Sequence, residues 1–373
     1  MKVGYYLFLG HGDYHPPDAM NKQWVASWDL DDWKRMIDQL VALKITTILL
    51  YLNGHRLPYK SQMYPDLVDS SHPNCQNEFL PELLEYIQKC HLETIAVLTT
   101  TGHAGVFGSL MPESVITLPK HDVDIEHTLC SFPLHMRRGK LEKKQGAAQL
   151  GHGVLCHNKS IAQQYAKKIL QEVLTRYGRY FSGVALHPPE SAYPCECATC
   201  NELFFQKYRA PIYQSDPRLV RSFFIETYLV FQNNQLFPII DRLLPKTTKI
   251  MFTIPWLFES SWQRINHLIP PEVTLIEWDY NLEPDRVLSL RNRLLQYLVS
   301  NRKLWFMPSA GFSFDDQKNI PEQIEAVLNQ VRTAIGAGAS AVIYFLGARS
   351  SAWIHETRMI EEEPSSQLTN RYQ

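Results

Sequence analysis

Short apolar runs alternate along the chain with longer segments of helical periodicity. Each of eight near-continuous apolar runs predicts a buried strand. They cover residues 3–10, 46–53, 93–101, 181–188, 249–256, 273–280, 303–310 and 341–347. Between the runs, apolar residues recur three and four positions apart, which predicts helices. In residues 29–44, for example, one helical face carries Trp33, Met36, Ile37, Leu40 and Val41.

This alternation predicts a single (β/α)8 barrel. Near-continuous apolar strands are typical of a parallel sheet that helices cover on both faces. Eight such units in 373 residues fit a closed barrel with insertions better than an open doubly wound sheet. We expect the barrel to span residues 1–353, from a first strand at Val3 to Gly10 to a last strand at Ala341 to Gly347. A long loop-rich insertion follows the third strand, at about 105–155, and a polar tail covers 354–373.

The composition narrows the classes of partner. A formal net charge of -1 without a basic run argues against nucleic-acid binding, and no apolar segment reaches the ~20 residues of a membrane span. The segment after the first strand, GHGDYHPPD, lacks the glycine pattern of a phosphate-binding loop. We read the N-terminus as a strand and not as a signal peptide, which predicts a cytoplasmic protein whose cysteines are thiols or metal ligands.

Polar and aromatic residues gather where the expected strands end, which is where such barrels carry their active sites. Carbohydrate chemistry needs two carboxylates, and aromatic rings give sugars flat surfaces to stack on. The 12% aromatic content suits that use, although a large core also needs many rings. The candidate catalytic residues are Glu190, Asp279 and Glu277. The candidate substrate-binding residues are His11, Asn53, His55, His103, His187, Trp256, Tyr280 and Trp353.

The candidate carboxylates differ in their setting. Glu190 ends the fourth strand in a turn stiffened by Pro188 and Pro189, which suits a side chain that must be held still. Glu277 and Asp279 alternate along the sixth strand and therefore share one face. If that face points into the barrel, the buried carboxylates require partners, which favours a functional role for them. If it points at the helices, we expect the assignment of the sixth strand to be wrong.

Three cysteines follow Glu190 in the pattern Cys195-x-Cys197-x-x-Cys200. Thiolates at this spacing suit a tetrahedral zinc site, which needs a fourth ligand that Cys156 or His157 could supply. Alternatively, the cysteines are reduced thiols that pin the loop after the fourth strand. A redox role is disfavoured because the C-x-x-C pair lacks a thioredoxin-like context.

The stretches GVALHPPESAYPCECATC and DLDDWKRMIDQLVALKITTILLYL resemble glycoside-hydrolase-like (β/α)8 barrel proteins of the family-20-like and α-glucuronidase-like superfamily. The resemblance covers strands one to four. It implies that Glu190 is a general acid, and family-42 β-galactosidases have a comparable cysteine cluster that binds zinc. The chain departs from family 20 in having Pro189 where an aspartate precedes the glutamate.

The seventh strand offers no carboxylate before Asp315, where many retaining enzymes place their nucleophile. The resemblance then implies a second carboxylate from strand six, Asp279 or Glu277, and slightly favours an inverting mechanism. In that mechanism Glu190 protonates the glycosidic oxygen and Asp279 activates water.

Three hypotheses for the function remain open. The first is a glycoside hydrolase that acts on a carbohydrate and requires no cofactor, with a structural zinc as one of the two interpretations of its cysteines. The second is a carbohydrate-binding barrel without catalysis, which a Glu190–Asp279 distance far beyond ~5–10 Å would favour. The third is a metal-dependent isomerase or hydrolase that uses the rim histidines, and the lack of an H-x-H or H-E-x-x-H pair disfavours it.

Overall fold

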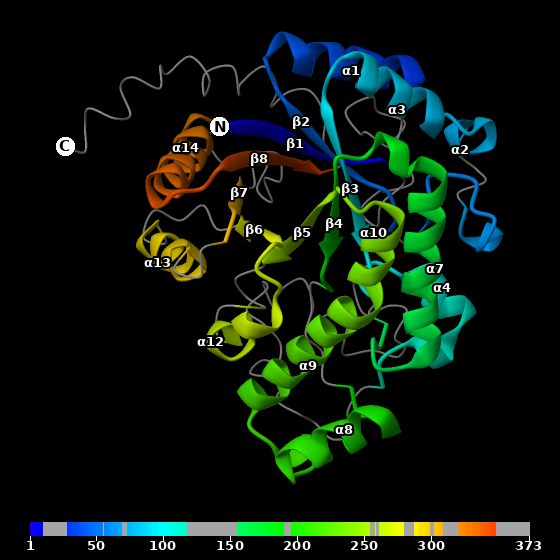
Figure 1. Ribbon diagram of the computed structural model, residues 1–373, viewed down its shortest axis with the longest axis vertical. Coiled ribbons are helices and arrows are strands. Elements are labelled where there is room, and N and C mark those ends of the chain that lie inside the picture. Colours follow the sequence, from blue (N-terminus) through cyan, green and yellow to red (C-terminus); the bar gives the residue numbers. More distant parts are fainter. Residues whose placement is uncertain are drawn as a thin grey trace.

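The computed structural model describes residues 1–9, 28–54, 56–68, 73–117, 155–189, 195–253, 258, 261–279, 287–298, 302–308 and 320–347. In these residues, eight strands close into a barrel in the order of the sequence (Figure 1). The strands are β1 Lys2–Phe8, β2 Thr47–Tyr51, β3 Glu93–Thr99, β4 Gly183–His187, β5 Thr248–Thr253, β6 Thr274–Asp279, β7 Leu304–Pro308 and β8 Ala341–Gly347. All neighbouring pairs are parallel, including β8 with β1. The predicted (β/α)8 barrel is confirmed.

The described helices lie around the barrel and within the loops that connect its strands. They are α1 Leu30–Ala42, α2 Pro73–Asn77, α3 Leu80–Lys89, α4 Gly105–Leu110, α7 Ser160–Tyr177, α8 Ala198–Tyr208, α9 Pro217–Phe231, α10 Phe237–Leu243, α12 Trp262–Ile265, α13 Val287–Leu298 and α14 Ile320–Ala337. A π-helical segment, η8 Gln232–Leu236, joins α9 to α10. Short 3-10 turns occur at Pro65–Leu67, Pro112–Ser114, Gly178–Tyr180, Ile212–Gln214 and Asn266–Leu268. None of the helices in the described ranges combines the length and apolar character of a membrane span.

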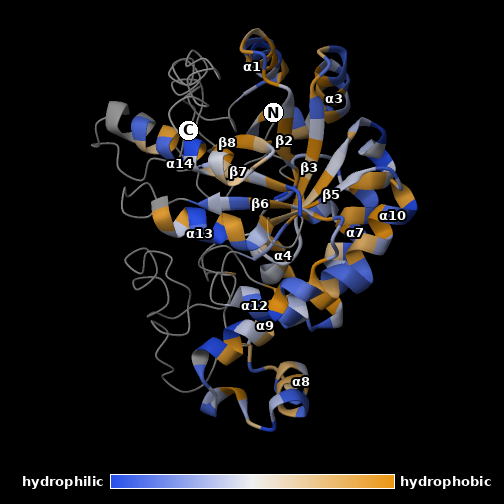
Figure 2. Cartoon of the chain, turned by 60° about the vertical axis from the view of Figure 1, so that its left-hand side comes forward, coloured by the Kyte–Doolittle hydropathy of each residue, from blue (hydrophilic) through white to orange (hydrophobic). Residues whose placement is uncertain are grey.

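The first helix shows how local sequence sets these elements. The Asp29 side chain accepts a hydrogen bond from the Asp32 backbone N–H and the Asp32 side chain accepts one from Asp29, which forms a capping box at the start of α1. Its buried residues are Trp33, Met36, Ile37 and Leu40. Val41, predicted on the same face, is 41% exposed and is not among the buried residues of α1. Figure 2 shows the same division of the helices into hydrophobic and hydrophilic sides.

Aromatic side chains fill the barrel interior. The Trp278 ring of β6 lies 4.9 Å from Phe345 of β8, 6.0 Å from Phe252 of β5 and 6.3 Å from Tyr6 of β1, measured between centroids. Contacts with strands from across the barrel place Trp278 inside it. Successive side chains of a strand point to opposite faces, so the neighbours of Trp278 in β6 point outward to the helices.

One helix was not predicted, and two predicted segments lie partly or wholly outside the described residues. Helix α8 was not predicted, although it contains Cys200 and begins directly after Cys197. After β3, the helix α4 and a 3-10 turn occupy the start of the expected insertion, whereas residues 118–154 lie outside the described residues. The polar tail 354–373 lies outside them as well, and the division at 353 stays a prediction.

Candidate functional site at the barrel mouth

The structure describes only part of the predicted site. Its candidate residues Glu190, His11, His55, Trp256, Tyr280 and Trp353 lie outside the described residues. The candidates that it describes are Asn53, His103, His187, Glu277, Asp279, Cys156, Cys195, Cys197 and Cys200. We predict that one pocket is lined by Glu190 together with His11, Asn53, His103, Trp256, Asp279, Tyr280 and Trp353, and this stays a prediction.

Two histidines meet at the carboxyl ends of β3 and β4. His187 is the last residue of β4, and its ring centroid lies 5.7 Å from that of His103, which follows β3. Tyr51, the last residue of β2, lies 5.8 Å from His103 and 6.2 Å from His187. His103 is only 4% exposed and His187 is 1% exposed. The barrel mouth thus gathers three side chains that combine a ring with a hydrogen-bonding group.

The loops after β3 and β4 approach each other closely beside these histidines. A Cβ atom at Gly102 would lie 3.0 Å from the Pro189 Cα atom, so only glycine fits here without displacement. The next residue, His103, has φ of 51°, a left-handed conformation that is uncommon outside glycine and typical of functional sites. Pro189 therefore packs against the β3 loop, and the chain reaches Glu190 one residue later.

Asn53 holds two strand ends together. Its Nδ2 atom donates to the Thr99 carbonyl at 2.9 Å, and its Oδ1 atom accepts from the Thr99 backbone N–H at 2.9 Å. Asn53 is 1% exposed, so this two-point contact is shielded from water. The contacts fix β2 against β3 below the histidines, and they support a structural role for Asn53.

The acidic residues of β6 share one arginine. The Arg293 Nε atom of α13 lies 2.9 Å from Glu277 Oε1, and Arg293 Nη2 also pairs with Asp279 Oδ2. The Thr253 hydroxyl of β5 donates to Glu277 Oε2 at 2.7 Å. Glu277 and Asp279 thus point at the helix layer, opposite to Trp278. The expectation that such an orientation would contradict the sixth strand is wrong, because Arg293 offsets the buried charges.

Burial raises the pKa of Glu277 to about 7 against the opposing effect of Arg293, and the Asp279 carboxylate adds to the rise. Folding therefore favours the protonated acid, and this stabilisation is lost as the pH rises from about 4.5 through about 7. We expect the free energy of unfolding to fall by about 2 kcal/mol more in the native protein than in Glu277→Gln over that range. Urea unfolding at pH 5.0 and 7.5 checks this, and parallel profiles would contradict it.

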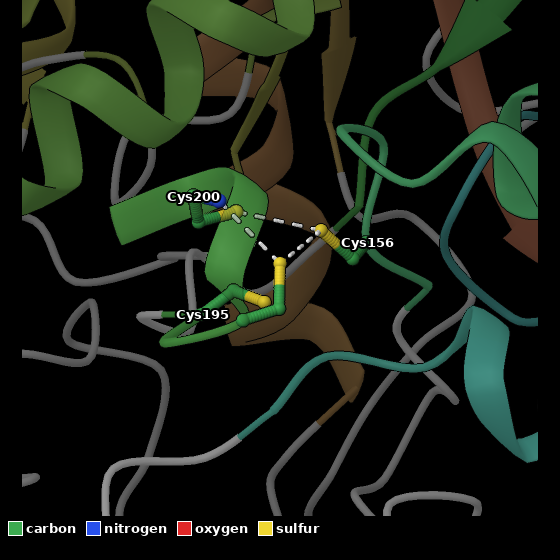
Figure 3. Close-up of side chains that lie close together, drawn as sticks. Cys156, Cys195 and Cys200 are labelled. Carbon is green, nitrogen blue, oxygen red and sulfur yellow. Dashed lines mark hydrogen bonds between the residues drawn. The ribbon is translucent and has the colours of Figure 1, made fainter. Parts of the chain in front are cut away.

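The predicted cysteine cluster forms. The Cys156, Cys195, Cys197 and Cys200 sulfur atoms all lie within 4.8 Å of one another, and Figure 3 shows those of Cys156, Cys195 and Cys200 gathered in one place. Cys156 Sγ lies 3.5 Å from Cys200 Sγ and 4.0 Å from Cys197 Sγ. A tetrahedron of sulfurs ~2.3 Å from a zinc ion has edges of ~3.8 Å, whereas a disulfide bond is ~2.05 Å long. The spacing fits a shared metal and not a disulfide.

Hydrogen bonds to sulfur support the same interpretation. The Thr117 backbone N–H donates to Cys195 Sγ at 3.3 Å, and the Cys200 backbone N–H donates to Cys197 Sγ at 3.5 Å. Hydrogen bonding from Cys156 lowers the pKa of both Cys195 and Cys197. Hydrogen bonds with the other three sulfur atoms raise the pKa of Cys156, so the shifts favour the thiolate, the form that binds zinc, at Cys195 and Cys197. Cys156 is the fourth member, whereas His157 Nε2 lies 2.8 Å from Thr227 Oγ1.

Comparisons with known proteins identify the fold. No family model matches the sequence, and no curated protein matches it. The structure is similar to a β-galactosidase from the psychrophilic Marinomonas ef1, with a TM-score of 0.63, 11% identity, and coverage of 99% of this chain and 62% of that one. It is also similar to a polyextremophilic β-galactosidase from the Antarctic haloarchaeon Halorubrum lacusprofundi, with a TM-score of 0.59, 13% identity, and coverage of 92% and 52%. A β-N-acetylhexosaminidase gives a TM-score of 0.55 at 13% identity, with coverage of 92% and 66%.

These similarities define the class of fold. The chain has the (β/α)8 barrel of these glycoside hydrolases, as the resemblance in sequence implied. It spans about half to two thirds of the length of the solved enzymes.

Sequence reasoning missed Arg293 and Tyr51. Arg293 carried a signal: it stands beside Leu294 and three positions after Leu290 on the buried face of α13, where a basic residue needs an acidic partner. Tyr51 lay inside an apolar run, and nothing in that run distinguished it from a core residue.

Proposed function

We propose that this protein is a glycoside hydrolase whose active site lies at the carboxyl ends of β3 and β4. The observation that carries the proposal is the packing of Pro189 on Gly102, beside His103 and His187. It supports the emergence of the next residue, Glu190, at the barrel mouth. The β-galactosidases and the β-N-acetylhexosaminidase of similar fold support a carbohydrate substrate.

In this proposal Glu190 is the general acid. It protonates the glycosidic oxygen as the bond to the leaving group breaks, a role that requires a fixed carboxyl group. The imidazoles of His103 and His187 bind sugar hydroxyl groups, since each ring can donate or accept a hydrogen bond. We propose the other rim candidates, His11, His55, Trp256, Tyr280 and Trp353, as further substrate-binding residues.

The contacts of the two β6 acids bear on the second carboxylate of the mechanism. The contacts of Glu277 with Thr253 and Arg293 support a role in holding Arg293 in place. Asp279 pairs with the same arginine, which supports a role in fixing the end of β6. That Asp279 is the base of an inverting mechanism stays a prediction. If it is the base, Asp279→Asn should lower activity as much as Glu190→Gln does. If Asp279 only fixes the end of β6, the loss of activity should be far smaller.

The orientation of the β6 acids also favours a second candidate function. A barrel that keeps its ring-lined mouth but has no second carboxylate there binds a carbohydrate without cleaving it. Both functions predict sugar binding, and only the first predicts turnover. The metal-dependent alternative gains no support, because the four cysteines form the one group of potential metal ligands found in the described ranges.

Screening the purified protein against a panel of aryl glycosides tests the proposed function. We expect phenol release from at least one β-galactoside or β-N-acetylhexosaminide. Binding of sugars in a thermal-shift assay without release of phenol from any member would instead support the carbohydrate-binding barrel.

We further propose that the four cysteines hold a structural zinc ion. Cys156 precedes α7 and the other three cysteines surround the start of α8, so a metal would join two segments distant in the sequence. Metal analysis of protein purified without chelator should find about one zinc per chain. Cys156→Ser should lose most of this zinc and lower the melting temperature, whereas Cys90→Ser, at a thiol outside the cluster, should keep it. Equal zinc contents would contradict the site.

The close approach at Gly102 gives a separate prediction. A side chain at this position would displace Pro189 and with it the start of the β4 loop. We expect Gly102→Ala to lower kcat about tenfold or more while changing the melting temperature little, because misplaced catalytic groups cost rate more than stability. Gly336→Ala is the control, since a Cβ atom there would meet nothing within 4 Å. Equal kcat values for the two variants would contradict the placement.

A further inference from the structure

We propose that Asn158, Thr227 and Tyr228 link the cysteine cluster to the ends of β3 and β4, so that metal binding and the packing of the barrel mouth stabilise each other. The inference rests on the zinc site proposed above, and it is independent of glycosidase activity. It deepens that site by assigning it positioning residues.

The link begins at a cysteine sulfur. The Asn158 Nδ2 atom donates to Cys200 Sγ at 3.4 Å and to Thr227 Oγ1 at 3.4 Å. An amide nitrogen carries two hydrogens, so it serves both acceptors at once. A donor to a metal-bound thiolate orients the ligand and stabilises its charge, and such partners govern metal affinity.

Thr227 fixes this donor to α9. Its hydroxyl oxygen lies 2.8 Å from His157 Nε2 and donates to the Phe223 carbonyl one turn earlier at 3.0 Å. These bonds fix Thr227 to its own helix and to His157, the neighbour of Asn158. The cluster is joined to a long helix and not only to a loop.

Tyr228, the next residue of α9, reaches the barrel mouth. Its hydroxyl lies 2.9 Å from Thr100 Oγ1 after β3 and donates to the His187 carbonyl at the end of β4 at 3.4 Å. Gln232 Nε2 donates to the same hydroxyl at 2.6 Å. Gln232 is fully buried and is the first residue of the π-helical segment η8. Such segments are rare in proteins, and those that occur often lie at functional sites.

The arrangement of the helices is consistent with this link. In both views α9 lies between α8 and the strands (Figures 1 and 2). Of two adjacent residues of α9, Thr227 thus contacts Asn158, the donor to Cys200, and Tyr228 contacts the strand ends. In this proposal metal binding stabilises the packed strand ends, and because coupling between two sites is reciprocal, a change that loosens those ends is expected to weaken metal binding.

Zinc affinity of the full chain, measured by competition with a chromophoric chelator, tests the link. We expect Asn158→Leu to raise the zinc dissociation constant about tenfold or more. Tyr228→Phe should raise it about fivefold, although it removes only the hydroxyl that contacts Thr100 and His187. Tyr180→Phe is the matched control, since the Tyr180 hydroxyl donates to Glu85 outside the link, and its affinity should stay within about twofold of the native value.

Native zinc affinity in Tyr228→Phe would overturn the link, and so would equal losses in Tyr228→Phe and Tyr180→Phe. A native protein that binds no zinc would overturn the link together with the zinc site, but would leave the proposed glycosidase untouched. A protein inactive on every glycoside whose zinc affinity depends on Tyr228 would reject the glycosidase and keep the link. Circular dichroism of each metal-free variant confirms folding. Thr227→Val, expected to resemble Asn158→Leu, provides a second test of the same contact.

Discussion

Glu190→Gln is expected to lower kcat by about 10²- to 10⁴-fold on a glycoside whose leaving group needs protonation, because general acid catalysis contributes that much to such reactions. Glutamine has nearly the same shape, but its amide hydrogens are not acidic enough to be transferred to the leaving oxygen. Sugar affinity and melting temperature should stay close to the native values, since the change removes chemistry and not packing.

Glu202→Gln is the matched control for Glu190→Gln. Glu202 lies on the exposed side of α8 and accepts a hydrogen bond only from Gln206 among the contacts described for it. This variant should keep full activity. Undiminished turnover by Glu190→Gln would end the assignment of Glu190 as the general acid. If that turnover came from a contaminating enzyme, the result would support the carbohydrate-binding barrel.

The second large effect concerns stability. Arg293→Met is expected to lower the free energy of unfolding by about 3 kcal/mol, because it leaves Glu277 and Asp279 buried next to each other without their shared cation. Protonation of Glu277, whose pKa burial already raises to about 7, limits the cost at low pH. The loss should therefore be larger at pH 8 than at pH 5.5 in urea unfolding.

Arg291→Met on the same helix is the control, since Arg291 is exposed. It should change the free energy of unfolding by less than about 0.5 kcal/mol. Adding Glu277→Gln to Arg293→Met should recover part of the lost stability, because one of the two stranded acids is then removed. Equal unfolding free energies for the native protein and Arg293→Met would show that the ion pairs contribute nothing.

The strands could be predicted because each is buried on both faces. A short apolar run such as residues 341–347, which lies between glycine-containing or polar segments, is too short for a helix. The strand β8 matches its predicted bounds. Helix α8 could not be found in this way. It begins at an N-cap cysteine, Cys197, whose sulfur accepts from the Cys200 backbone N–H, and cysteine is not among the usual capping residues.

The spacing of the cysteines predicted their convergence but left the fourth ligand open between Cys156 and His157. Adjacent residues point in different directions, and only the fold shows that Cys156 joins the cluster while His157 faces Thr227. Similarly, alternation in β6 showed that Glu277 and Asp279 share a face but not which one. The large ring of Trp278 occupies the interior, and a single arginine from a distant helix makes the outward orientation tolerable.

The most direct test of the central claim compares leaving groups. A missing general acid matters most when the leaving group is a poor one that needs protonation, and least for a dinitrophenolate that departs without a proton. For one sugar accepted by the native protein, kcat/KM of Glu190→Gln should fall about 10³-fold on an alkyl glycoside and less than about tenfold on the dinitrophenyl glycoside. Equal losses on both substrates would contradict the role of Glu190 as general acid, and with it the proposed active site.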